Sequence, residues 1–489
     1  MNTILRSTAA ATLLAALLSP SAGATEHLRV ATYNVLGVDP GSSSYASLVD
    51  ILTRLDADVV LLQEIGTAGG STLSQFQANS QVAELAADTG YAHNAVSFLS
   101  GTLSGGLRVG VLSRYPILET ISHDAFSLSG SFGSNDMTRD ILQTTLDVPD
   151  IDVPVACFTL HLKASGGEIN EFRRAVELRR LEQAVGGFCA QNPDGFAFVG
   201  GDFNWDVGNF SAEVFGQNDY LSFKANGLPS SYTLGPDITF PLIYNPPATM
   251  SALQGCTQGM VFADATWEDS TTQTGTFQSG SRLDYMFSEG PQVGRLQPLI
   301  DEVYRSASDD GIDAAPAGQY LPKFGAGPLP SSASGSASDH FPLVATYRLE
   351  SSNGGRLGFQ TAGQYALAPF AGYEGQAVLG STDFAFSVSQ ARPNSPAFLM
   401  IGGFQFPPIS LATLLPDFFG NPLAFLYVPL DAFQVVLSTD SRGEARLPSG
   451  LPNNPALLGG PPIYSQWVVL DPAASGGFAT TSDAYFLQL

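Results

Sequence analysis

The sequence predicts an α/β layered domain followed by an all-β module. From residue 28 to about 348, strand-like runs alternate with helical patterns, which is typical of helices packed on a sheet. From residue 357 onward, short runs rich in β-branched and aromatic residues are separated by Pro, Gly and Asn, and no helical period of useful length occurs. The polar stretch ESSNGGR at 350–356 lies between the two regions and is typical of a linker.

The strands expected in the first domain are bounded by Gly, Pro or Asp. The clearest helix is expected over 168–188, where apolar residues recur near every 3.6 positions, and two further helices over 45–55 and 82–87. The segment 306–338 is rich in Ser, Ala, Gly and Pro, so we expect a long surface loop between two core strands. The expected strands cover residues 28–35, 58–65, 106–113, 141–148, 153–162, 196–203, 283–289 and 342–349.

The second region is expected to fold as a β-sandwich, built from the runs AFLMIGG, AFLYVPL, FQVVLST, QWVVLD and AYFLQL. A length of 489 residues corresponds to roughly two to four domains. We therefore expect a first domain over residues 25–350, a linker over 351–356 and a β-sandwich module over 357–489.

The composition excludes several classes of protein. The chain has 45 Asp+Glu against 21 Lys+Arg and a formal net charge of -24, which argues against a protein that coats nucleic acid stably. A catalyst that contacts a polyanion briefly is still allowed. The chain has 32 Phe and 16 Tyr to bury, so it is not a disordered protein. Beyond the N-terminal region no apolar run reaches about 20 residues, which argues against a helical membrane protein.

The first 24 residues have the layout of a secretory signal peptide. Arg6 precedes a short apolar stretch from Ala9 to Leu18, and Ala22-Gly23-Ala24 supplies the small residues of a cleavage site. The alternative is a membrane anchor, but the stretch is too short to span a bilayer comfortably. We expect cleavage after Ala24 and a secreted or periplasmic protein with no integral membrane segment in the mature chain.

The chain has three cysteines, and an odd number leaves at least one unpaired unless chains are linked. Cys157 lies inside the expected strand VACFTLHL, so we expect a core thiol. Cys189 and Cys256 lie next to loop-like sequence, and export would allow them to form a disulfide. The cysteines and the five histidines have no zinc-site spacing.

Polar side chains that can carry chemistry lie at the ends of the expected strands. In open α/β sheets ligands bind at strand ends, although Asp and Asn at a strand end are also common as caps. Carboxylate and amide oxygens suit Mg²⁺, Mn²⁺ or Ca²⁺, and histidine acts as an acid or base near neutral pH. A Ser nucleophile is less favoured because no G-x-S-x-G motif occurs. The residues are Asn34, Glu64, His161, Asp202, Asn204, Asp284, Asp339 and His340.

Six segments in order, ATYNV, LLQEI, FTLHLKA, GGDFN, RLDYMF and SDHFPL, resemble the motif series of the endonuclease/exonuclease/phosphatase superfamily. The resemblance covers residues 28 to about 348. It implies the DNase I-like fold, a four-layer α/β sandwich in which two mixed β-sheets pack face to face with helices outside. It also implies a divalent cation, Mg²⁺ or Mn²⁺ with Ca²⁺ as an alternative. Asn34, Glu64 and Asp339 resemble the metal-site residues, Glu64 being the direct ligand.

The resemblance also implies the catalytic roles. Asp202 resembles the residue that orients or activates the attacking water, and Asn204 a stabiliser of the pentavalent transition state. His340 resembles the catalytic histidine at the scissile phosphate, and Asp284 the carboxylate that orients it. His161 resembles the second histidine that some members place at the phosphate.

Arg139, in TRDILQTTL, lies where nuclease-like members place a phosphate-contacting arginine, with a surface salt bridge as the alternative. The resemblance thus implies a metal-dependent phosphodiesterase that acts through metal-activated water, and first a nuclease. A monomer is favoured, and the signal-peptide layout predicts secretion. Only three lysines occur, so no broad basic groove is expected. One alternative is a sphingomyelinase-like or inositol-phosphate or lipid phosphoesterase, whose partner would be a phospholipid headgroup. Another is a non-catalytic secreted binding protein on the same fold.

Overall fold

The computed structural model describes the first domain from residue 27 and the C-terminal module in shorter segments. In the first domain the described residues are 27–67, 73–98, 107–148, 151, 153–206, 213–253, 255–256, 259–270, 272–289, 296–309 and 328–349. In the module they are 354–357, 369–374, 379–382, 384–389, 391–403, 405, 407–410, 425–428, 433–440, 443–457, 460–472, 474 and 479–487. The expected signal peptide, residues 1–24, lies outside the described residues.

Two six-stranded mixed sheets form the centre of the first domain. The first sheet has the strand order β13-β14-β1-β2-β4-β3, with β1 parallel to β2. The second has the order β11-β12-β8-β7-β6-β5, with β7 parallel to β8. The first sheet contains β1 (His27–Asn34), β2 (Val59–Ile65), β3 (His93–Val96), β4 (Arg108–Ser113), β13 (Leu296–Val303) and β14 (Leu343–Leu349). The second contains β5 (Ile117–His123), β6 (Ile141–Leu146), β7 (Val155–His161), β8 (Phe196–Asp202), β11 (Met260–Phe262) and β12 (Asp284–Glu289).

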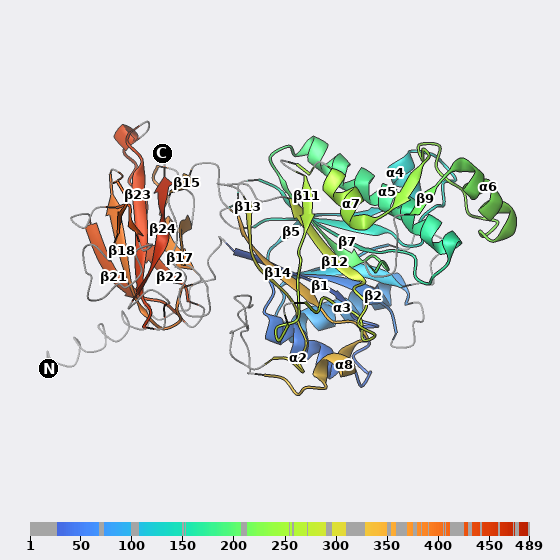
Figure 1. Cartoon of the computed structure of the whole chain (residues 1–489), viewed down its shortest axis with the longest axis horizontal. Helices are drawn as coiled ribbons and strands as arrows, with labels where there is room; N and C mark the ends of the chain where they lie inside the picture. The colour runs from blue at the N-terminus through green and yellow to red at the C-terminus, as the bar shows by residue number, and fades with distance from the viewer. Residues whose placement is uncertain are drawn as a thin grey trace.

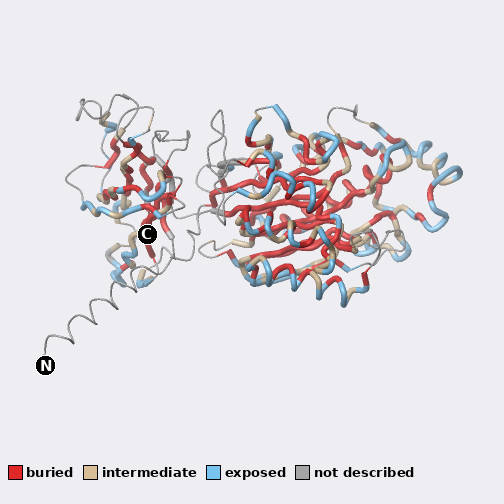
Figure 2. The backbone as a smooth tube through the Cα atoms, turned by 90° about the horizontal axis from the view of Figure 1, so that it is seen from below, coloured by how far each residue is buried: buried red, intermediate tan, exposed pale blue. Residues whose placement is uncertain are grey.

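The two sheets pack face to face through apolar side chains, and the strands are buried throughout this layer (Figure 2). Val30 and Leu61 from the first sheet share one core with Cys157 and Phe198 from the second. Cys157 is a free, buried thiol, as expected, and burial raises its pKa to about 12. The sheets approach closely at Gly200, where an added Cβ would lie 2.7 Å from Leu61 Cδ1 and would force that side chain to shift.

Helices cover the outer face of each sheet (Figure 1). One cluster packs α2 and α3 on the first sheet, and a second cluster packs α5 and its neighbours on the second sheet. The result is the four-layer α/β sandwich that the sequence predicts. The first sheet is covered by α2 (Tyr45–Leu55), α3 (Gln75–Thr89) and α8 (Ala333–Ala337). The second is covered by α4 (Ala125–Ser129), α5 (Glu168–Gln191), α6 (Gln217–Asn226) and α7 (Pro246–Ala252), with the small hairpin of β9 (Glu213–Phe215) and β10 (Leu242–Tyr244).

Local signals explain where the helices begin and end. The expected helix at 82–87 is longer in the structure. A capping box formed by Ser74 and Gln77 starts α3 at Gln75, seven residues before Val82. Gly90 ends α3 in the left-handed conformation, with φ 80°. The expected surface loop at 306–338 is only partly a loop. Residues 310–327 lie outside the described residues, but Ala333 and Ala337 of α8 are buried against α2.

The C-terminal module is all-β, as predicted. A five-stranded sheet, β15-β24-β23-β18-β21, and a three-stranded sheet, β16-β17-β22, share one core that includes Trp467, Leu399 and Phe384. Its elements are β15 (Gly354–Leu357), β16 (Phe370–Glu374), β17 (Ala385–Ser389), β18 (Pro396–Gly402), β19 (Ile409–Ser410), β20 (Phe425–Leu426), β21 (Phe433–Ser438), β22 (Ala445–Pro448), η3 (Pro455–Leu457), β23 (Ile463–Leu470) and β24 (Ala479–Leu487).

The expected linker at 351–356 is not free over its whole length. Its last residues belong to β15, which pairs with β24 through backbone hydrogen bonds. Ladder pairing needs no particular side chain, so the Gly-Gly pair concealed this strand in the sequence. Arg348 at the end of β14 connects the two parts, because it donates to the backbone oxygen of Ala371 and lies 5.7 Å over the ring of Tyr485. Among the described residues, no helix is long and apolar enough to cross a membrane.

Candidate active site

The strand register brings three of the expected catalytic residues side by side at one edge of the second sheet. His161 ends β7 and lies opposite Asp202, which ends the parallel strand β8. Asp284 begins the antiparallel strand β12 and lies opposite Asp202 on the other side. The pairing therefore places Asp202 at the centre, between a histidine and a second carboxylate.

His340 forms a short contact with Asp284. Its Nδ1 lies 2.7 Å from Asp284 Oδ2, and both side chains are almost fully buried. The backbone N–H of His340 donates to Ser338 Oγ at 3.1 Å, and Ser338 Oγ donates to the backbone oxygen of Asn34 at 2.7 Å. The ring of Phe277 meets the imidazole edge-on, with the centroids 4.9 Å apart. These contacts fix His340 and leave Nε2 to face Asp202.

Asp202 collects the remaining side chains from both sheets. Its Oδ2 accepts from Asn34 Nδ2 at 3.1 Å and lies 3.5 Å from His161 Nε2 and 3.8 Å from His340 Nε2. Glu64 Oε1 from the first sheet lies 3.7 Å from His161 Nε2. The structure therefore brings Asn34, Glu64, His161, Asp202 and His340 together, although they come from five separate segments of the chain.

A β-bulge turns Glu64 toward this cluster. Along β2, Leu61 packs between the sheets and Leu62 packs under the helices, so strict alternation would point residue 64 toward the helices. The register with β4 shifts between Leu62 and Ile65, and Glu64 takes the left-handed conformation with φ 59°. Such a conformation costs of order 1–3 kcal/mol in a non-glycine residue, which points to a functional reason for it.

Asn204 also has a strained backbone, with φ 50° two residues after Asp202. Its backbone N–H donates to Asp202 Oδ1 at 2.8 Å, and its Nδ2 donates to the backbone oxygen of Leu162 at 3.2 Å. The turn thus holds the Asp202 carboxylate and places the Asn204 amide beside the chain that follows His161.

A buried polar network joins the two sheets beneath the site. Gln63 Nε2 donates to Thr32 Oγ1 at 3.1 Å and, across the sheets, to Thr159 Oγ1 at 3.0 Å. Thr276 Oγ1 accepts from the backbone N–H of Asp284 at 3.0 Å, which fixes the start of β12. Sequence reasoning missed these positioning residues, because a single Thr or Gln in a strand carries no local signal.

The two histidines have opposite pKa shifts. For His161, burial is the main influence, and Arg139, His340 and Lys163 add to it, so the pKa lies well below its usual value. Burial would also lower the pKa of His340, but Asp284 and then Asp202 and Asp339 outweigh it and raise the pKa to about 10. At neutral pH, His161 is therefore neutral and His340 is an imidazolium.

The pKa of Asp202 is raised to about 7. Burial is the main cause and the charge of Asp284 adds to it, while His340, the Asn204 N–H and Asn34 act in the opposite direction. A carboxylate with a pKa near the operating pH is suited to accept a proton, so the site contains one acceptor and one donor at neutral pH.

Arg139 lies directly behind His161. Its Nη1 donates to the backbone oxygens of His161 and Leu162, both at 3.2 Å, and its Nε is buried with no hydrogen bond among the described residues. No carboxylate of the described chain forms an ion pair with it, so the alternative of a surface salt bridge is not what the structure contains. Arg173 and Arg174 in the first half of α5 are also buried. They bond to Thr138 and to the backbone that follows His161.

Side chains that could bind a metal ion converge at the site. The ligand atoms of Glu64, His161 and Asp202 lie within 4.8 Å of one another, and neither ring nitrogen of His161 has a hydrogen bond among the described residues. Two carboxylates and a neutral imidazole fit a divalent cation. Asn34 lies against this group, with its Oδ1 accepting from the Leu36 N–H at 3.3 Å. Asp339 is half-buried, and among the described residues its carboxylate belongs to no group of three converging ligand atoms.

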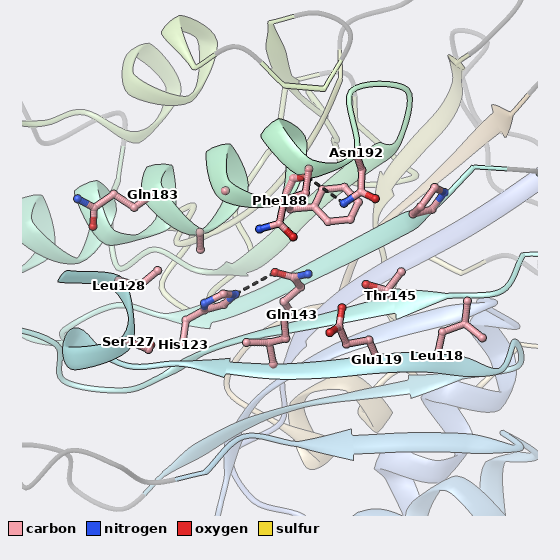
Figure 3. A pocket seen from close by; sticks show the side chains of 15 residues that line it. Leu118, Glu119, His123, Ser127, Leu128, Gln143, Thr145, Gln183, Phe188 and Asn192 are labelled. Carbon is pink, nitrogen blue, oxygen red and sulfur yellow. Dashed lines mark hydrogen bonds between the residues drawn. The ribbon is translucent and has the colours of Figure 1, made fainter. Parts of the chain in front are cut away.

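A separate cavity of about 470 Å³ lies on the outer face of the second sheet (Figure 3). It is bounded by β5, β6, α4 and the second half of α5, and His123 and Gln143 hydrogen bond to each other in it at 2.9 Å. None of the convergent residues lines it, so the candidate active site is defined by its chemistry and not by this cavity.

The disulfide that the sequence allows is present in the first domain. Cys189 near the end of α5 forms a disulfide with Cys256, 67 residues away in sequence. The Cys256 backbone N–H also donates to Glu289 Oε1 at 2.9 Å at the end of β12. The disulfide thus ties the long helix on the second sheet to the strands that carry Asp284.

Comparisons with known proteins find several similar solved structures. The chain is similar in structure to an endonuclease/exonuclease/phosphatase from Beutenbergia cavernae DSM 12333, with 16% identity, coverage of 94% of this chain and 100% of the other, and a TM-score of 0.40. It is similar to the human Nocturnin catalytic domain with bound sulfate anion, with 15% identity, coverage of 66% and 95%, and a TM-score of 0.38. It is also similar to D. rerio TDP2 complexed with single strand DNA product, with 15% identity, coverage of 66% and 99%, and a TM-score of 0.37.

No curated protein matches the sequence significantly. The sequence model of the Endonuclease/Exonuclease/phosphatase family matches residues 31–340, which is more than half of the chain and includes every residue of the cluster. Members of this family are phosphoric-ester hydrolases that generally use divalent metals. The chain therefore belongs to the Endonuclease/Exonuclease/phosphatase family.

Proposed function

We propose that this protein is a divalent-metal-dependent phosphodiesterase, and specifically a nuclease. The observation that carries the proposal is the arrangement around Asp202, where a neutral His161 and a protonated His340 lie 3.5 and 3.8 Å from the same carboxylate oxygen. Hydrolysis of a phosphodiester requires one group that accepts a proton from water and one that stabilises negative charge on phosphorus oxygens. At neutral pH the Asp202 carboxylate supplies the first group and the His340 imidazolium supplies the second.

Glu64, with Asn34 beside it, would hold Mg²⁺ or Mn²⁺. When bound, the cation would neutralise charge on a phosphate oxygen and lower the pKa of a coordinated water. Asp339 is proposed to contribute through water at the edge of the site, since its carboxylate is not in direct contact with the others. We propose Mg²⁺ or Mn²⁺ because carboxylate and amide oxygens are hard ligands, which these cations prefer.

The protein's own groups then have the following roles. Asp202 orients the attacking water and accepts its proton, for which a pKa of about 7 is suited. His340 donates to a phosphate oxygen, and Asp284 keeps it protonated through the 2.7 Å contact. His161, Asn204 and Arg139 contact the phosphate, and the unpartnered Nε of Arg139 supplies a donor for it.

We also propose that the protein is exported and acts as a monomer outside the cytoplasm. The disulfide between Cys189 and Cys256 supports an oxidising compartment. The signal-peptide layout of residues 1–24 supports export, and we place the catalytic domain at 25–350 and the β-sandwich module after the linker that begins at 351.

A panel of substrates tests the function. Purified protein is incubated with single-stranded and duplex DNA, RNA, sphingomyelin vesicles and bis-p-nitrophenyl phosphate, with Mg²⁺ and with excess EDTA. We expect hydrolysis of nucleic acid with Mg²⁺ and no hydrolysis with EDTA. Full activity in EDTA would exclude the metal, hydrolysis of sphingomyelin alone would move the enzyme to the lipid phosphoesterases, and no hydrolysis of any substrate would favour a binding protein.

A matched pair of variants strengthens this test. Glu64→Gln removes the charge of the expected direct ligand, and Glu182→Gln is the control. Both glutamate side chains are 19% exposed, and among the described residues Glu182 pairs only with Arg179 on the surface of α5. We expect Glu64→Gln to raise the Mg²⁺ concentration for half-maximal activity at least tenfold and Glu182→Gln to leave it unchanged. Equal effects of the two variants would remove Glu64 from the metal site.

A further inference from the structure

Arg305 lies at the same end of the sandwich as the candidate active site. The antiparallel register pairs Val303 at the end of β13 with Leu343 at the start of β14, and the Tyr304 N–H donates to the Pro342 oxygen at 2.9 Å. The same ladder, continued outward, brings Arg305 beside Phe341, the residue that follows His340. Arg305 is thus a neighbour of the catalytic loop, on the side of the sheet edge formed by β13.

The Arg305 guanidinium lies flat against aromatic rings. Its central carbon is 3.7 Å from the ring centroid of Trp267 and 5.2 Å from that of Phe341. Trp267 is itself fixed, because its Nε1 donates to the Gly275 oxygen and its backbone N–H to the Gln273 oxygen, both at 2.8 Å. A guanidinium that is held against a fixed indole loses little freedom on binding a ligand, so its donors are preorganised.

The guanidinium has no polar partner within the described chain. It forms no ion pair there, and its Nε is buried without a hydrogen bond. The other described arginines of the domain differ: Arg54, Arg114 and Arg180 pair with carboxylates, and Arg139 and Arg174 donate to backbone oxygens. A guanidinium with no polar partner among the described residues, beside the candidate active site, points to an external anion.

We propose that Arg305, seated on Trp267, binds the phosphate next to the scissile phosphodiester in a nucleic-acid strand. This inference rests on the proposed function and narrows its substrate class. A planar fork of N–H donors matches phosphate oxygens, and a strand presents a second phosphate beside the one being cleaved. A phosphocholine lipid has a single phosphodiester followed by a cation, which the guanidinium would repel. The residue is a substrate-binding group and acts on affinity more than on the chemical step.

The test compares an extended substrate with a minimal one. Initial rates of full-length protein with Mg²⁺ are measured on a single-stranded DNA 12-mer and on bis-p-nitrophenyl phosphate, for wild type, Arg305→Ala, Arg305→Lys and the surface control Arg179→Ala. Arg179 pairs only with Glu182 in the described structure and lies on α5. Thermal melts of each variant confirm that it folds.

We expect Arg305→Ala to raise KM for the 12-mer about tenfold, because one charge-assisted hydrogen-bonded contact is lost. The KM for bis-p-nitrophenyl phosphate should change far less. Arg305→Lys should retain part of the affinity, because the charge remains but the planar fork is lost. The slope of log affinity against log salt should fall by about 0.7 in Arg305→Ala, the value for one phosphate contact to a single strand. Arg179→Ala should behave as wild type.

Two results would overturn the inference. One is an equal effect of Arg305→Ala and Arg179→Ala on the 12-mer. The other is wild-type hydrolysis of sphingomyelin vesicles without hydrolysis of the 12-mer, which would leave a phosphoesterase but remove the nucleic-acid strand. Fluorescence anisotropy with a labelled 12-mer in EDTA tests Arg305 separately from catalysis. If the wild type cleaves nothing, loss of binding in Arg305→Ala alone would still support the contact, and unchanged binding would refute it.

Discussion

The substitution Asp284→Asn should change the charge state of His340 without removing a side chain. The Asp284 carboxylate lies 2.7 Å from His340 Nδ1, in a site where both side chains are almost fully buried. Burial lowers the pKa of His340, and Asp284 is the largest influence that raises it, to about 10 from an ordinary 6.5. Between three and four pKa units correspond to roughly 5 kcal/mol in favour of the imidazolium. Asp202 and Asp339 share in that figure, so the amide should remove only a part of it.

NMR titration in EDTA measures this shift. In the wild-type protein the His340 ring should stay protonated through pH 8, whereas in Asp284→Asn only Asp202 and Asp339 oppose burial and the ring should lose its proton at lower pH. His123 is the internal control, because burial also lowers its pKa and its side chain bonds to Gln143, far from Asp284 in the fold. Identical titration of His340 in the two proteins would refute the assigned role of Asp284.

The contact between Asp284 and His340 should also make the free energy of unfolding depend on pH. The folded pKa of His340 is raised above its unfolded value, so its contribution to stability is fully present below about pH 6.5 and is lost as the pH rises through about 10. In EDTA, the free energy of unfolding of the wild type should therefore fall more between pH 6.5 and 10 than that of Asp284→Asn. Denaturant melts across this range measure the difference, and parallel curves would contradict the shift.

Three further predictions concern stability and domain organisation. Reduction of the disulfide between Cys189 and Cys256 should lower the free energy of unfolding by about 4 kcal/mol, the loop-closure value for a separation of 67 residues, and a melt with and without reductant measures it. Arg180→Ala should cost about 3–5 kcal/mol, since it leaves the fully buried Asp136 without the guanidinium 2.7 Å away, and a denaturant melt that matches wild type would contradict this. A chain that ends at Leu349 should be soluble and folded, because no described residue of the module contributes to the three cores of the first domain, and aggregation of this chain would show that the module is needed.

Much of the fold could be predicted because its strands are buried on both faces. All eight strands expected in the first domain exist, and their ends agree within a few residues. The strands that the sequence did not reveal are short or irregular. Strand β13, for example, contains Pro298 at a register shift, and β3 has only four residues. Periodicity needs longer regular runs than these, so such strands form only through pairing with neighbours.

The site could be predicted as a set of residues but not as a geometry. Motif order identifies Asp202 and His340, yet only strand register shows that Asp202 lies between His161 and Asp284. The bulge at Glu64 depends on a pairing shift with another strand, which has no sequence signature. The burial of Arg173 and Arg174 likewise depends on contacts with Thr138 and with the backbone after His161, which no local sequence pattern reveals.

The most direct test of the account is the rate of Asp202→Asn on single-stranded DNA with saturating Mg²⁺. Asp202 is the residue on which His161, His340 and Asn34 converge, and it is proposed to accept the proton of the attacking water. Loss of a general base should reduce kcat about 10²–10⁴-fold, and a thermal melt should show a folded protein. A folded Asp202→Asn variant that cleaves at the wild-type rate would contradict the central claim that chemistry occurs at this carboxylate.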